Sequence, residues 1–139
     1  MQPVPLRLRP GEDLRESLER LLTARGCEAA FVLAGIGSLA AVRLRFAGEA
    51  EPSTIDGAVE MLTLSGSLSP TSSHLHMSVA GADGRVLGGH VAHGCIVRTT
   101  AEVLVALLPD WSMTRVPDPA TGYPELVVQR KAEPRSGGR

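Results

Sequence analysis

The stretch HLHMSVAGADGRVLGGHV, residues 74–91, is typical of a β-hairpin and decides the fold around it. Residues 81–84 are turn formers, and they separate two segments in which apolar and polar side chains alternate. Gly84 suits the left-handed position that closes a three-residue hairpin loop. A loop of this kind places His76 directly opposite His90 on the two strands.

In this register the hairpin segregates its side chains by polarity. A two-residue loop would instead pair Leu75 with His90 and mix the two sets, because a slip of one residue turns every side chain to the other face. The apolar face then carries Leu75, Met77, Val79, Leu87 and Val91. The polar face carries His74, His76, Ser78, Gly88 and His90. The clean segregation favours the three-residue loop.

Three imidazoles therefore converge on the polar face, from His74, His76 and His90. Imidazole nitrogens bind zinc at about 2.0–2.1 Å, and three protein ligands leave a fourth position open, as in catalytic zinc sites. We predict a divalent metal site, with zinc as the cation. The competing interpretation is a set of hydrogen-bonded surface histidines, which is the usual role of a histidine on a strand.

The remaining ionisable residues near this hairpin divide into two groups. His93 has the opposite parity from His90 and is expected to lie outside the metal site. Glu60 and Glu102 are the carboxylates that could approach the histidines from neighbouring strands. The pattern leaves open whether either does so, and therefore whether the site is catalytic.

The rest of the chain predicts one helix and further short strands. In residues 10–26 the leucines recur at helical spacing, Glu12 and Asp13 occupy the first turn, and Gly26 is a suitable C-terminal cap. The expected strands are residues 4–9, 29–36, 39–46, 59–68, 74–79, 86–91, 96–100, 102–108, 111–116 and 126–129, with a bend at Gly35 and Gly37. Residues 102–108 also suit a helix by composition, but the segment is short and ends at Pro109, which favours a strand. These elements predict an α+β fold: a mostly antiparallel sheet of about seven strands and one main amphipathic helix.

Composition restricts the class of protein. The chain has 139 residues, a net charge of −1 and four aromatic residues, so it lacks the basic excess and the stacking side chains of a stand-alone nucleic-acid binder. Cys27 and Cys95 lie in apolar surroundings, as expected of buried reduced thiols. The sequence contains no apolar segment long enough for a signal peptide or a membrane span, so we expect a soluble, cytoplasmic protein.

Length and composition also set the domain organisation. Residues 1–130 are expected to form a single domain, and the polar segment 131–139 a disordered tail. Other short motifs indicate no chemistry. Gly35-Ile36-Gly37-Ser38 lacks the third glycine and the helix of a dinucleotide fingerprint. Arg43 and Arg45, which alternate with apolar residues, are interpreted as a solvated strand face.

Three segments together resemble the plants-and-prokaryotes-conserved (PPC) domain: GAVEMLTLSGSL (57–68), HLHMSVAGADGRVLGGHVAHGCIVRTTAEVLV (74–105) and DPATGYPEL (118–126). The resemblance spans roughly residues 4–130. It implies a compact α+β domain that assembles as a homotrimer, with the histidines matching His74, His76 and His90 forming a metal site, zinc by preference. In plants the domain accompanies AT-hook DNA-binding motifs, whose Arg-Gly-Arg-Pro core is lacking in the final residues 134–139.

Three hypotheses follow. The first is a small homotrimeric protein that holds a divalent metal at His74, His76 and His90 and takes a small-molecule ligand there. The second is a DNA-associated or transcription-related interaction module, although direct nucleic-acid binding is disfavoured by the charge. The third is a metal-dependent hydrolase or lyase acting on a small molecule, which requires a carboxylate or another proton carrier near the metal.

Overall fold

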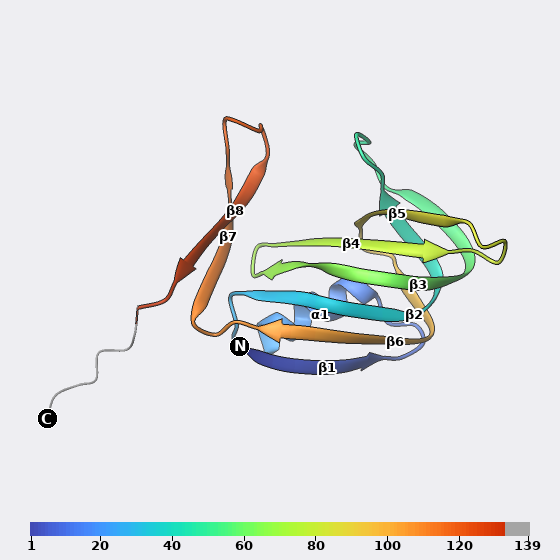
Figure 1. Cartoon of the computed structure of the whole chain (residues 1–139), viewed down its shortest axis with the longest axis horizontal. Helices are drawn as coiled ribbons and strands as arrows, with labels where there is room; N and C mark the ends of the chain where they lie inside the picture. Colours follow the sequence, from blue (N-terminus) through green and yellow to red (C-terminus); the bar gives the residue numbers. More distant parts are fainter. Residues whose placement is uncertain (133–139) are drawn as a thin grey trace, which may run out of the picture.

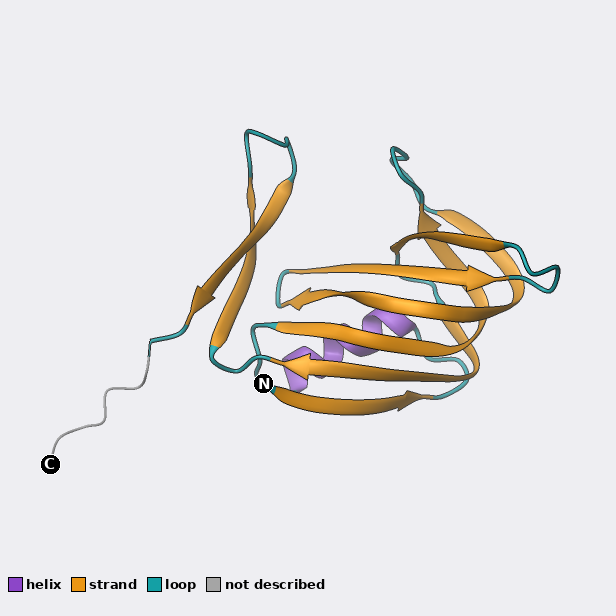
Figure 2. Cartoon of the chain, in the orientation of Figure 1, coloured by secondary structure: helices purple, strands orange, loops and turns teal. Residues whose placement is uncertain are grey.

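The computed structural model describes residues 1–132, which form one helix and eight strands (Figures 1 and 2). In chain order the elements are β1 (Gln2–Leu8), α1 (Leu14–Ala24), β2 (Ala30–Arg45), β3 (Ser53–Ser69), β4 (Ser72–Ala80), β5 (Val86–Val91), β6 (Ile96–Leu107), β7 (Trp111–Pro117) and β8 (Pro124–Arg130). The predicted α+β class is confirmed. Most of the segment expected to be a tail, residues 133–139, lies outside the described residues.

Six strands form one antiparallel sheet in the order β1-β6-β2-β3-β4-β5. The sheet curls, because the end of β2 also pairs with β5, where Leu44 faces Val91 and Arg45 faces His90. Helix α1 lies across one face, behind the sheet in Figure 1. Its Leu14, Leu18 and Leu22 are buried against the sheet, where they join the main hydrophobic core.

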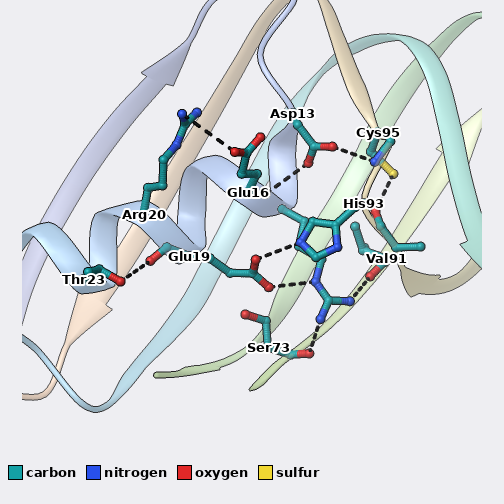
Figure 3. Close-up of polar contacts among 12 residues, drawn as sticks. Asp13, Glu16, Glu19, Arg20, Thr23, Ser73, Val91, His93 and Cys95 are labelled. Carbon is teal, nitrogen blue, oxygen red and sulfur yellow. Dashed lines mark hydrogen bonds and ion pairs between the residues drawn. The ribbon is translucent and has the colours of Figure 1, made fainter. Parts of the chain in front are cut away.

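The helix begins and ends as its sequence signals predict, with one refinement. Glu12 and Asp13 both precede the first turn, and Asp13 is the N-cap, since its carboxylate accepts a hydrogen bond from the backbone N–H of Glu16 at 3.0 Å. The other carboxylate oxygen accepts from the N–H of Gly94 at 2.6 Å. Asp13 therefore ties the helix start to the loop before β6 (Figure 3). Gly26 adopts the expected left-handed conformation just after the helix, with φ 57°.

The hairpin register deduced from the sequence is confirmed. His76 pairs with His90, the N–H of Gly81 donates to the carbonyl of Arg85 at 3.0 Å, and Gly84 has φ 77°. The predicted apolar face of the β4–β5 hairpin is buried against the core. Leu87 is the exception, with 45% of its surface exposed, because the loop end of the edge strand β5 has β4 as its only sheet neighbour.

Two predictions about strands need correction. Residues 29–36 and 39–46 were expected to be separate strands, but β2 runs continuously from Ala30 to Arg45. Residues 96–100 and 102–108 are likewise joined in one strand, β6. Bulges absorb the expected bend, since the pairing of β2 with β6 shifts register around Gly37. A Cβ atom on Gly37 would lie 2.3 Å from the carbonyl oxygen of Thr100, so glycine allows β6 to approach β2 at this point.

The second correction concerns the C-terminal strands, which were assigned to the main sheet. Strands β7 and β8 instead form a separate two-stranded sheet that projects beside it (Figure 2). Its base is anchored where the N–H of Met113 donates to the carbonyl of Glu28 at 3.1 Å and Met113 is buried. This arrangement brings one side of β7 toward the ends of β3 and β4.

Two further expectations concern the thiols and the membrane. Cys27 and Cys95 are both free and buried, as predicted, and burial raises the pKa of the Cys95 thiol. Within residues 1–132 the one helix has 11 residues, and no helix has the length and apolar character needed to cross a bilayer.

Candidate metal centre

The three predicted histidines come together on the face of β4 and β5 that points away from the buried core. His74 and His76 are two residues apart on β4, so their side chains project from the same face. His90 is directly opposite His76 on β5.

Gly66 on β3 has φ 143°, and a Cβ atom there would lie 2.0 Å from the carbonyl oxygen of His74. A glycine in β3 is thus required for β4 to carry His74 at this position.

The ring nitrogens converge closely. The Nε2 atom of His76 lies 3.0 Å from Nε2 of His74 and 3.1 Å from Nδ1 of His90. One nitrogen from each ring lies within 4.8 Å of the others. Tetrahedral zinc with bonds of about 2.0–2.1 Å separates its ligand nitrogens by about 3.3 Å. Two of the three separations are close to this value, and the third can reach 4.8 Å, so the rings of His74 and His90 must draw together for three imidazoles to hold one zinc-sized cation.

Two arginines lie beside the cluster, and the sequence analysis had assigned neither to a site. Arg115 on β7 donates to Nδ1 of His74 at 3.2 Å and to the hydroxyl of Ser67 at 3.3 Å. Arg45 on β2 pairs directly across from His90, so both side chains project from the same face. The alternation around Arg45 placed it on a polar strand face. The local sequence pattern did not indicate that this strand face lies beside the histidines, or that β7 contacts His74.

The charge and partial burial of this region favour the neutral form of two of the histidines. Desolvation, followed by the positive charge of Arg115, lowers the pKa of His74 below its ordinary value of 6.5. Desolvation, followed by the charge of Arg45, lowers the pKa of His90 in the same direction. Both imidazoles are therefore neutral at pH 7, and a neutral ring offers a lone pair to a metal.

The structure places the other candidate residues elsewhere. Glu60 and Glu102 line a shallow depression with Ser38 and Thr99, whose hydroxyls are hydrogen bonded to each other. None of the three histidines lines this depression. The carboxylate that acts on the cluster is Glu125 of β8, whose charge opposes the lowering of the His74 pKa. Because β8 is distant in the sequence, the alternation of residues along β4 and β5 could not predict that Glu125 lies near the histidines.

His93 lies outside the cluster, as its parity predicts. Its Nε2 atom is 2.8 Å from a carboxylate oxygen of Glu19 on α1 (Figure 3). The other carboxylate oxygen of Glu19 accepts from Arg15, which also donates to the carbonyls of Val91 and Ser73. These contacts attach the helix to the ends of β4 and β5, so we assign His93 a structural contact.

Similarity to known proteins agrees with this architecture. The sequence is 46% identical to part of the bifunctional protein GlmU of a Synechococcus strain, over 93% of this chain and 21% of that protein. The chain thus spans about a fifth of the length of that relative. It is also 34% identical to the AT-hook motif nuclear-localized protein 28 of Arabidopsis thaliana, over 84% of this chain and 63% of that protein.

Solved structures show the same fold. A hypothetical protein from Salmonella enterica superposes with a TM-score of 0.91 at 35% identity, covering 94% of this chain and 95% of the other. A protein from Archaeoglobus fulgidus that is described as metal-containing superposes with a TM-score of 0.75 at 27% identity, covering 91% and 94%. A family model of the Plants and Prokaryotes Conserved (PCC) domain matches residues 1–109. The chain therefore belongs to the Plants and Prokaryotes Conserved domain family, the PPC domain of the sequence analysis.

Proposed function

We propose that this protein is a homotrimeric metal-binding protein whose three-histidine centre holds one divalent cation per chain, with zinc as the preferred ion. The observation that carries this proposal is the convergence of three ring nitrogens at 3.0 and 3.1 Å spacing. The description of the A. fulgidus relative as metal-containing supports it. The ligand atoms would be Nε2 of His74, Nε2 of His76 and Nδ1 of His90.

Three ligands leave a fourth coordination position open to a small molecule. When bound, a divalent cation supplies Lewis-acid polarisation of a ligand oxygen at that position. The residues of the chain hold the cation, and desolvation together with the charges of Arg115 and Arg45 favours the neutral form of His74 and His90. Glu60 and Glu102 are not at the cluster to act as proton carriers, so the geometry argues against a hydrolase or lyase that uses either of them.

Metal analysis of untagged protein tests this proposal. After purification without chelators, we expect about one zinc per chain by mass spectrometry, as one three-histidine site requires. Dialysis against a chelator should remove the metal, and added zinc should restore the stoichiometry. Protein that stays below a tenth of an equivalent after such reloading would rule out the metal centre, leaving the histidines as hydrogen-bonded surface residues.

The homotrimer is part of the same proposal, and exposed apolar side chains support it. Leu33, Ile36, Leu62 and Leu104 on β2, β3 and β6 are 36–56% exposed. Ile36 and Leu62 line the same depression as Glu60. A cluster of apolar side chains on a folded surface marks a contact with another molecule, and cyclic symmetry would cover it on every copy. Size-exclusion chromatography with light scattering should give three times the chain mass, and a monomer at micromolar concentration would contradict the assembly.

A second candidate function is a DNA-associated interaction module. The 34% identity to the Arabidopsis AT-hook protein favours it. The near-neutral charge of the chain opposes direct DNA contact, because nucleic-acid affinity depends on neutralising phosphates with Lys and Arg. A mobility-shift assay at two salt concentrations separates the two functions: we expect no shift, whereas binding that weakens steeply with salt would favour the DNA-associated module.

A further inference from the structure

The histidine cluster lies between two guanidinium groups that come from different parts of the fold. Arg115 reaches it from β7, outside the main sheet, and bonds His74. Arg45 reaches it from β2, opposite His90, and one of its nitrogens donates to the carbonyl of Glu49 at 3.1 Å. Each guanidinium has five N–H donors, so both keep donors for a further partner.

The contact between Arg115 and His74 determines which ring nitrogen carries the proton. Arginine only donates hydrogen bonds, so Nδ1 of His74 must accept. A neutral imidazole has one acceptor and one donor, and the proton of His74 therefore lies on Nε2. That N–H points at Nε2 of His76, 3.0 Å away. The one lone pair of His76 Nε2 accepts this bond, in an arrangement that needs no cation.

The same contact is incompatible with His74 acting as a metal ligand through Nε2. In that state Nε2 must offer its lone pair and the proton moves to Nδ1. Nδ1–H would then face a guanidinium that can only donate. Arg115 must leave His74, and although it can keep its bonds to Ser67 and Pro124, the donor released from His74 loses its partner beside a divalent charge. An anion that accepts hydrogen bonds from Arg115 pairs the donor released from His74. It also reduces the repulsion between the guanidinium and the metal cation.

We propose that Arg115 and Arg45 form an oxyanion subsite next to the metal centre, and that Arg115 exchanges His74 for a carboxylate or phosphate oxygen of a small-molecule ligand when the metal is bound. This inference rests on the proposed metal centre. The planar guanidinium fork matches both kinds of oxyanion. Glu125 contributes negative charge near His74, but one carboxylate does not balance two guanidinium groups and a dication.

The test is a zinc titration with and without a simple oxyanion. Wild-type protein is titrated calorimetrically in a buffer whose only anion is chloride, and then with acetate or methylphosphonate present. At least one oxyanion should tighten zinc binding about tenfold, and zinc should tighten binding of that oxyanion by the same factor, because coupling between two ligands is reciprocal. Acetate and methylphosphonate arms distinguish a carboxylate from a phosphate group.

The Arg115→Gln variant tests whether Arg115 exchanges His74 for the oxyanion when zinc binds. The introduced amide oxygen can accept from Nδ1–H of His74, so zinc affinity in chloride should rise roughly threefold to tenfold while the response to the oxyanion disappears. Arg45→Gln should reduce the oxyanion response and raise zinc affinity less, since Arg45 makes no bond to a ring nitrogen. Arg20→Gln on α1 is the matched control: it removes the same charge from an exposed residue and should behave as wild type.

The outcomes separate this inference from the metal centre itself. Wild-type protein that binds zinc with no response to either oxyanion would overturn the subsite, as would Arg115→Gln protein that binds zinc more weakly in chloride than wild type does. Zinc-dependent affinity for duplex DNA greater than that for methylphosphonate would place the oxyanion on a nucleic acid and overturn the small-molecule assignment. Wild-type protein that binds no zinc would instead remove the proposed function, and the subsite with it.

Discussion

Replacing His76 by alanine is the most direct test of how the histidines act together. The Nε2 atom of His76 is the central one of the three, 3.0 Å from the nitrogen of His74 and 3.1 Å from that of His90. Without it, a cation would retain two protein ligands. Four-ligand structural zinc sites reach apparent binding free energies of about 10–16 kcal/mol, so one ligand contributes on the order of 3 kcal/mol, or roughly a hundredfold in Kd.

The assay compares His76→Ala with a matched histidine outside the cluster. His93→Ala removes an imidazole that is 57% exposed and bonded to Glu19, so zinc affinity should stay within about twofold of wild type. Zinc titration against a chromophoric chelator gives both dissociation constants, and circular dichroism reports the fold. The fold should persist in His76→Ala, because His76 is exposed and its neighbours Leu75 and Met77 stay buried.

Two results would refute this reasoning. Equal loss of zinc in both variants would mean that the loss does not come from the cluster. Full retention of zinc by His76→Ala, with an intact fold, would mean that the convergence of the three rings has no role in metal binding. Unfolding of His76→Ala alone would be distinguished by circular dichroism, and His76→Gln, which keeps a polar side chain on β4, then gives the same comparison.

Three other outcomes are expected. Acidification below pH 6.5 should weaken zinc binding, because protons then compete with the cation for the rings. The lowered pKa values of His74 and His90 mean that the unfolded chain binds more protons than the folded chain does. The metal-free fold should therefore lose stability as the pH falls below 6.5, and urea midpoints across pH 5–8 measure this. Asp13→Ala removes both the helix cap and the partner of the Gly94 N–H, so it should reduce the free energy of unfolding by about 2–4 kcal/mol in urea titrations. Glu16→Ala is the control and should reduce the free energy of unfolding much less. Gly66→Ala should destabilise the protein by about 2 kcal/mol or more and also weaken zinc binding, because its Cβ would collide with the carbonyl of His74; a variant that keeps wild-type affinity would show that β3 does not set the position of His74.

Local sequence was sufficient for the hairpin and for the three-histidine cluster. The loop ending at Gly84 selects a register, and strict alternation then assigns each side chain of β4 and β5 to a face. Leucine spacing and Gly26 were likewise sufficient for α1. These features depend on residues close together in the chain, where steric limits on the backbone and the period of the side chains act directly.

Tertiary structure alone decided the surroundings of that cluster. Alternation indicates that Arg45 lies on a polar face, but not that the curl of the sheet pairs it with His90. No local pattern indicates that β7 leaves the sheet and brings Arg115 to His74. The same limit explains Glu60 and Glu102, which were candidates to approach the histidines from neighbouring strands but line a different depression. The pairing of strands depends on how much apolar surface the whole chain buries and on where bulges shift the register. These are contacts between distant segments, so no local sequence pattern predicts them.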